Sequence, residues 1–273
     1  MNTGQSNSTN PLLPSFLRAF NWVEAILLLI AGSVFFLSDL VRPHWPWVIA
    51  PFNAGFVGAV YLGSFTATAL MIFHDRWAPA RIVLPMILVF TVIVLGVTLI
   101  HLEQFDFQNP ATWGWIFFYI ALPLNCVYHL WVFRGLPPGD AHSTPDRWRY
   151  FLWAFAALIG LYGLALMIVP VPATAFWPWP IDAFHGQMYS SAFVTIAVGS
   201  YLIARKGDLV EWSTLGLTLI VIAAASILGL WLVDASVPLD NKVNWALPGT
   251  WAWVMLMVMI GLTGTGMFWR SRR

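Results

Sequence analysis

Charge and cysteine are both scarce in this chain. Only 9% of its 273 residues are Asp, Glu, Lys or Arg, against about a quarter in an ordinary soluble domain. So few charges cannot cover a water-facing surface, which excludes a soluble globular protein, a disordered chain and a nucleic-acid-binding protein. The single cysteine, Cys126, excludes a disulfide framework, a CxxC redox pair and a thiolate metal cluster. With 59% hydrophobic residues, an all-α integral membrane protein remains.

Long apolar runs give the number of spans. A span needs roughly 20 mostly apolar residues to cross the hydrocarbon core, and eight segments qualify. We expect transmembrane helices near 18–38, 51–73, 81–102, 112–133, 149–169, 183–204, 212–233 and 248–269.

Lys and Arg predict the orientation. Eleven of the 13 lie on one side of the expected spans, and only Arg42 and Lys242 lie on the other. The positive-inside rule therefore predicts cytoplasmic termini in a plasma (inner) membrane. Residues 1–16 form a polar N-terminal tail without the positive start of a secretory signal. Most of the 17 tryptophans lie at span ends, as interfacial belts do.

An internal duplication is the strongest signal. Residues 45–53 (WPWVIAPFN) match 177–185 (WPWPIDAFH), and TWGW at 112–115 matches TWAW at 250–253. These matches predict two tandem four-helix repeats, which we place at 17–135 and 149–273 with a cytoplasmic linker at 136–148. Because four spans is an even number, both repeats insert in the same orientation, related by a pseudo-twofold axis along the membrane normal.

Polar residues at membrane depth mark the candidate sites, because each is costly there. Asn53 and His185 occupy matching positions in the two repeats, and Gln187 and Tyr189 follow on the same helix as His185. These four are the candidate ligand-binding residues, at the outer end. The alternative is a polar interface in contact with water. No metal-binding spacing such as H-x-x-x-H supports a metal site.

Two further polar groups are secondary candidates. His101 and Glu103 end the third span, while Asn125 and His129 share a face of the fourth span. His129 fits either an axial ligand or an interhelical hydrogen bond that holds the bundle together. Glu24, near the inner edge of the first span, is expected to reach the membrane surface or to pair with a neighbour.

The four-plus-four arrangement is similar in outline to haem A synthase. That family carries paired histidines in both halves and a Glu-x-x-His motif; here Asn53 stands where the match to His185 would be, and the motif is missing. No family residues are therefore carried over.

The sequence leaves three functions open. The first is a non-enzymatic protein that binds a lipophilic ligand or a membrane-protein partner. The second is a transporter for a small or amphipathic solute with an outer-half pocket. The third is a membrane enzyme or redox subunit that uses the outer His and carboxylate residues. The sequence identifies no cofactor, and whether the chain is an enzyme stays open.

Overall fold

The computed structural model describes residues 10–36, 44–136 and 142–272. Eight of its helices are long and apolar enough to cross a membrane, which makes the chain a multi-pass, membrane-type helical protein. They are α1 (Ser15–Phe36), α2 (Pro51–His74), α3 (Trp77–Ile100), α4 (Pro110–Val132), α5 (Asp146–Ile168), α7 (Ala183–Arg205), α8 (Leu209–Ser236) and α9 (Pro248–Ser271).

Short elements complete the connections. They are η2 (Leu102–Gln104), α6 (Pro170–Ala173), η3 (Leu239–Asn241) and an antiparallel pair of strands, β1 (His142–Ser143) with β2 (Lys206–Gly207). Asn10–Pro14, inside the expected N-terminal tail, lie along the α2–α3 turn, where Leu13 donates to the carbonyl of Asp75. Residues 1–9 of the tail and 137–141 of the expected linker lie outside the described residues.

Helix ends follow local chemistry. Proline begins α2, α4 and α9, where its missing N–H costs nothing. Asp182 accepts a hydrogen bond from the His185 backbone N–H and so caps α7. At α8, Asp208 and Glu211 form a reciprocal capping box.

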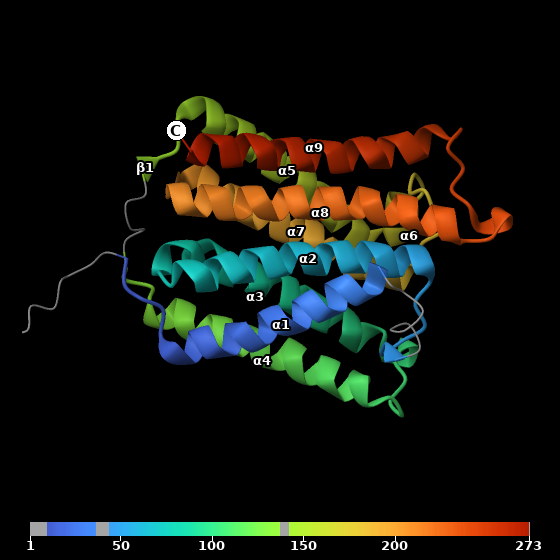
Figure 1. Ribbon diagram of the computed structural model, residues 1–273, viewed down its shortest axis with the longest axis horizontal. Helices are drawn as coiled ribbons and strands as arrows, with labels where there is room; N and C mark the ends of the chain where they lie inside the picture. The colour runs from blue at the N-terminus through green and yellow to red at the C-terminus, as the bar shows by residue number, and fades with distance from the viewer. Residues whose placement is uncertain (1–9, 37–43, 137–141, 273) are drawn as a thin grey trace, which may run out of the picture.

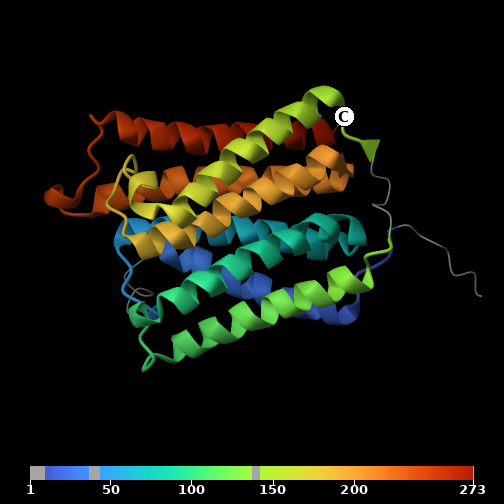
Figure 2. The ribbon, with the colours of Figure 1, turned by 180° about the vertical axis from the view of Figure 1, so that it is seen from behind.

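Four helices form the centre of the bundle. Across the middle, α2 packs on α8 and α3 packs on α7; outside them α1 packs on α2, α4 on α3, α5 on α7 and α9 on α8. Figures 1 and 2 show α1 and α4 along one edge and α5 and α9 along the opposite edge. The central helices α2 and α7 are the most buried.

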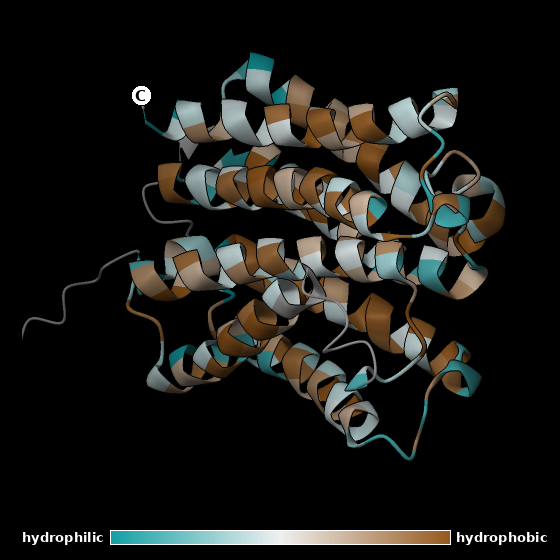
Figure 3. Cartoon of the chain, turned by 45° about the vertical axis from the view of Figure 1, so that its right-hand side comes forward, coloured by the Kyte–Doolittle hydropathy of each residue, from teal (hydrophilic) through white to brown (hydrophobic). Residues whose placement is uncertain are grey.

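The outer helices instead expose many large apolar side chains, as lipid-facing helices do. Hydrophobic residues run along the length of the helices in Figure 3.

The two ends of the bundle differ. We call the end that holds residues 44–50 and 174–182 the tryptophan-rich end, and the end that holds the α2–α3 and α7–α8 turns the arginine-rich end. At the arginine-rich end the Arg81 side chain of α3 forms a bidentate ion pair with Glu211 of α8 and also donates to the Lys206 carbonyl. Glu211 is fully buried, so this pair joins two central helices.

Candidate functional site

Two clusters of three tryptophans lie at the tryptophan-rich end. Trp45, Trp47 and Trp115 form the first, with ring centroids 4.9–5.6 Å apart. The second has centroid distances of 5.1–5.8 Å and is built from Trp177, Trp179 and Trp253. Their rings meet edge to face, an arrangement favoured by the aromatic quadrupole.

Each cluster donates a hydrogen bond to the helix that follows the other. Trp47 Nε1 donates to His185 Nε2 on α7 over 3.2 Å. In the same way Trp179 Nε1 donates to Asn53 Oδ1 on α2 over 2.8 Å. His185 and Asn53 are therefore brought close to the tryptophans, and each accepts an indole N–H that burial would otherwise leave without an acceptor.

Asp182 holds the other side of the His185 ring. Its carboxylate lies 2.8 Å from His185 Nδ1 and 2.8 Å from the His185 backbone nitrogen. Partial burial by itself raises the pKa of Asp182, but these hydrogen bonds outweigh it and hold the pKa below its usual value. The contacts with Asp182 and Trp47 orient the His185 ring, with Nδ1 toward Asp182 and Nε2 toward Trp47.

Gln187 joins three segments of the chain. Its side-chain oxygen lies 2.6 Å from His101 Nε2, and its nitrogen donates to the Met167 carbonyl. His101 Nδ1 in turn lies 3.3 Å from the exposed Glu103 carboxylate, whose pKa is lowered chiefly by a backbone hydrogen bond. These groups mainly tie α3, α5 and α7 together at the tryptophan-rich end.

Tyr189 differs from the other three predicted ligand-binding residues. Its ring stacks on Trp177 with centroids 5.4 Å apart, and its buried hydroxyl finds no hydrogen-bond partner among the described residues. It lines a small cavity of about 40 Å³ together with His185. A space of this size holds about one or two water molecules and no larger ligand.

Asn125 and His129 lie in the half of α4 nearer the arginine-rich end. His129 Nδ1 bonds within α4, 2.9 Å from the Asn125 carbonyl, and its ring stacks on Phe16 of α1. His129 therefore contacts α1 through its ring, and its hydrogen bond lies within α4 rather than between two helices as expected. The buried Asn125 amide has no hydrogen-bond partner in the described part of the chain.

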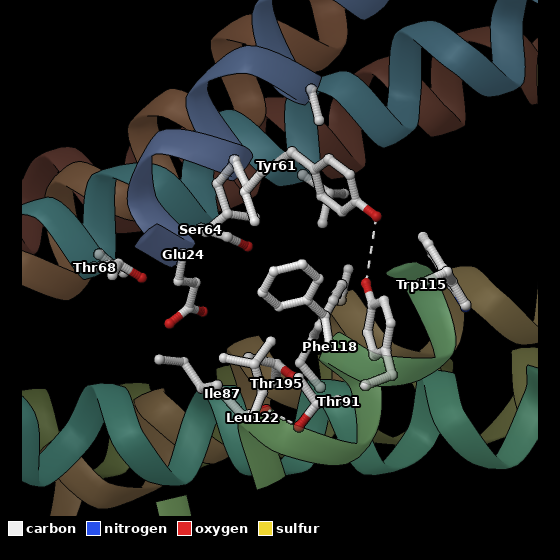
Figure 4. A pocket seen from close by; sticks show the side chains of 18 of the residues that line it. Glu24, Tyr61, Ser64, Thr68, Ile87, Thr91, Trp115, Phe118, Leu122 and Thr195 are labelled. Atoms are coloured by element: carbon white, nitrogen blue, oxygen red, sulfur yellow. Dashed lines mark hydrogen bonds between the residues drawn. The ribbon is translucent and has the colours of Figure 1, made fainter. Parts of the chain in front are cut away.

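A larger apolar cavity, which shares Tyr61 and Tyr119 with the small one, lies among the first four spans. It encloses about 420 Å³ and is lined mainly by α1, α2, α3 and α4, with a few residues of α7 and α8. Its walls are apolar and aromatic, and Figure 4 shows Glu24 and Thr68 on one side, facing Ile87 and Thr91. A volume of this size matches that of sites for small organic molecules, which occupy roughly 300–1,000 Å³.

Glu24 is the polar group that sequence reasoning misjudged. The expectation was a side chain that reaches the membrane surface or pairs with a neighbour, but Glu24 is only 7% exposed and lines the cavity. Its Oε2 finds no hydrogen-bond partner among the described residues. Arg18, on the same helix, instead pairs with Asp75 at 2.8 Å.

Other polar groups of the cavity wall are partly satisfied. The hydroxyls of Tyr61 and Tyr119 lie 3.3 Å apart and join α2 to α4, and Thr91 donates to the Ile87 carbonyl. Thr68 is buried, and its hydroxyl has no partner within the described residues. The cavity therefore presents one free carboxyl oxygen and a few hydroxyls inside an apolar wall.

No group of three His, Cys, Asp or Glu among the described residues is arranged to hold a metal ion. Comparison with known proteins gives no match: no family model, no curated protein and no solved structure resembles this chain significantly. The cavity geometry and the sequence are therefore the grounds for a function.

Proposed function

We propose that this protein binds a lipophilic or amphipathic molecule in the cavity among α1, α2, α3 and α4. The observation that carries the proposal is the cavity itself, about 420 Å³ of apolar and aromatic space with the Glu24 carboxyl inside it. Well-packed protein interiors contain few voids larger than a water molecule. We therefore attribute an apolar cavity of this size, with a carboxyl group inside it, to a ligand.

We also propose that the bundle consists of two related four-helix units, the first formed by α1–α4 and the second by α5, α7, α8 and α9. The packing pattern supports them: α1 on α2 and α3 on α4 in the first unit correspond to α5 on α7 and α8 on α9 in the second. The crossed bonds from Trp47 to His185 and from Trp179 to Asn53 also correspond, since donors and acceptors are each 132 positions apart.

Helices α1 and α5 give the same register. An added Cβ at Gly32 of α1 would meet Leu62 of α2, and one at Gly163 of α5 would meet Val194 of α7. The two glycines are 131 positions apart, so we align α1 with α5 at a spacing of 131 residues.

The two units then differ in polarity. With this register, Asn21 and Glu24 of α1 correspond to Leu152 and Phe155 of α5, both buried. With the spacing of the TWGW and TWAW motifs, Tyr119 of α4 corresponds to Met257 and His129 to Met267, whereas Asn125 corresponds to the polar Thr263.

We infer that Asn21, Glu24, Tyr119 and His129 are not needed for a four-helix unit to pack, because their proposed counterparts in the second unit are apolar. We therefore assign binding to the first unit and support of the bundle to the second.

A cavity-filling variant tests this proposal. An added Cβ at Gly114, which lines the cavity, meets nothing within 4 Å, so we expect α4 to accept Gly114→Phe and its ring to occupy part of the cavity. The corresponding position in α9 is Ala252, which is exposed, and Ala252→Phe is the matched control.

Native mass spectrometry of gently extracted protein should show a discrete bound mass in the wild type and in Ala252→Phe. In Gly114→Phe the mass should be reduced. Equal retention of the bound mass in all three proteins, or a bare wild type, overturns the proposal.

A transporter is the alternative that the same cavity fits, since a carrier needs such a site as well. The outer-half pocket expected for it is weakly supported, because Asn53, His185 and Gln187 are each held by partner side chains. Flux of a bound molecule across proteoliposomes separates the two: a carrier releases it on the opposite side, and a binding protein retains it.

A further inference from the structure

We infer that the cavity selects an amphipathic organic cation, whose positive group pairs with Glu24 and whose apolar body lies among the aromatic rings. The inference rests on the proposed binding function and specifies its ligand. It follows from the chemistry of the Glu24 carboxyl, the aromatic wall and the part of the wall that is exposed outside the bundle.

Among the described residues, no side chain compensates the Glu24 carboxyl. An ionised carboxylate in an apolar interior is very costly unless a cation and hydrogen-bond donors compensate it. Glu24 is only 7% exposed. Arg18, a base on the same helix, forms an ion pair with Asp75 instead. Among the described residues no side chain forms an ion pair with it. A bound cation supplies the missing charge.

The aromatic wall favours a cation over a neutral body. Trp45, Tyr61, Phe90, Phe118 and Tyr119 all line the cavity. The face of an aromatic ring attracts a cation within about 6 Å, and the attraction grows when water is excluded. A carboxylate at one end of an aromatic-walled space is therefore suited to organic cations with apolar substituents.

Part of the cavity wall is formed by residues that are also exposed on the outside of the bundle. Leu27 and Ile30 of α1 line it and are 41% and 55% exposed. In a lipid-facing helix these residues border the hydrocarbon region of the membrane. A ligand that already partitions into the bilayer can reach the site along this side, which is the behaviour of an amphiphile.

Tetraphenylphosphonium is the cationic probe, and triphenylphosphine oxide is a neutral probe of similar shape. Equilibrium binding is measured on full-length protein in detergent for the wild type, Glu24→Gln and Glu24→Phe. The Phe variant introduces the residue of the corresponding position in α5, Phe155, which packs there without a polar partner. Glu103→Gln removes an exposed acid outside the cavity and is the matched control.

We expect both Glu24 variants to bind tetraphenylphosphonium at least about tenfold more weakly, because a charge-assisted contact is lost. Binding of triphenylphosphine oxide to Glu24→Gln should change less than about twofold, and Glu103→Gln should match the wild type. A wild type that binds both probes equally, or a Glu24→Gln variant that loses both alike, overturns the cation inference while cavity binding stands. A wild type that binds neither probe contradicts the proposed function as well.

Mass spectrometry of the extracted ligand then distinguishes the source of the cation. A positively charged lipid in the wild type that is lost in Glu24→Gln identifies a membrane lipid, and a smaller cationic mass with the same loss identifies a free lipophilic cation. An anionic or neutral ligand retained by Glu24→Gln contradicts the inference.

Discussion

A buried indole N–H needs an acceptor, and at the tryptophan-rich end His185 supplies it for Trp47. We predict that His185→Ala destabilises the protein by about 1–3 kcal/mol, because the Trp47 N–H is left buried and unpaired. Unfolding by sodium dodecyl sulfate, followed by tryptophan fluorescence, measures the change.

His185→Asn is the informative companion variant. Asn53 accepts the corresponding bond from Trp179 through its side-chain oxygen, so an asparagine at 185 should recover part of the lost stability. If His185→Ala unfolds like the wild type but loses a bound molecule, His185 serves a ligand and the structural role is wrong.

The Asp182 carboxylate predicts a dependence of stability on pH. Hydrogen bonds from His185 hold the pKa of Asp182 below its ordinary value of 3.8 in the folded protein. The unfolded protein therefore binds the proton more readily, so this contribution to stability is full above pH 3.8 and is lost as the pH falls through the lower folded pKa. Asp182→Asn should weaken this acid-induced loss. Unfolding midpoints of both proteins between about pH 2.5 and 6 test it, and parallel curves would contradict the assignment.

Sequence reasoning reached some of these residues and missed others for a physical reason. Asn53 and His185 stood out because motif matches placed them at corresponding positions, and the structure brings both to the tryptophan-rich end. Glu24 was expected to reach the membrane surface or to pair with a neighbour because it lies near the inner edge of the first span. Which face of α1 turns toward a cavity depends on how α1, α3 and α4 pack, and no local pattern records that.

At the scale of elements, the ion pair between Arg81 and Glu211 links α3 to α8 at the arginine-rich end. Glu211 is fully buried and accepts from Arg81 while also capping α8 through the Asp208 backbone N–H. We predict that Arg81→Met costs about 3–5 kcal/mol, because it leaves a buried carboxylate unpaired. The same detergent unfolding measures it.

The double variant separates charge from packing. Arg81→Met with Glu211→Gln removes both charges but keeps an acceptor for the cap, and it should recover much of the loss. A double variant as unstable as Arg81→Met alone would show that the cost comes from the shape of the Arg81 side chain.

The helices themselves were the easiest part to predict. All eight expected spans overlap a helix of the structure, because a long apolar run in lipid must satisfy its backbone hydrogen bonds within the segment. The ends were less accurate. For α8 the expected span 212–233 falls short of Leu209–Ser236, since hydropathy discounts the charged capping residues Asp208 and Glu211 that begin the helix.

On the scale of the whole molecule, orientation is the main prediction that the fold leaves to experiment. The sequence has 11 of its 13 basic residues on the expected cytoplasmic side of the spans, so we expect the arginine-rich end to face the cytoplasm. Cys126 is buried, and Cys126→Ala gives a background without thiols. In it, Gln108→Cys places an exposed thiol at the tryptophan-rich end and Gly135→Cys places one at the arginine-rich end.

A membrane-impermeant maleimide should label Gln108→Cys in intact cells and Gly135→Cys only after the cells are permeabilised. An added Cβ at Gly135 meets nothing within 4 Å, so that variant should fold and its lack of labelling in intact cells would report access. The reverse pattern would invert the predicted orientation. It would not affect the proposed pair of units, because four spans in each keep both units parallel whichever end faces out. One span, α4, lies between the two positions. Labelling of both from the same side would therefore show that α4 does not cross the membrane.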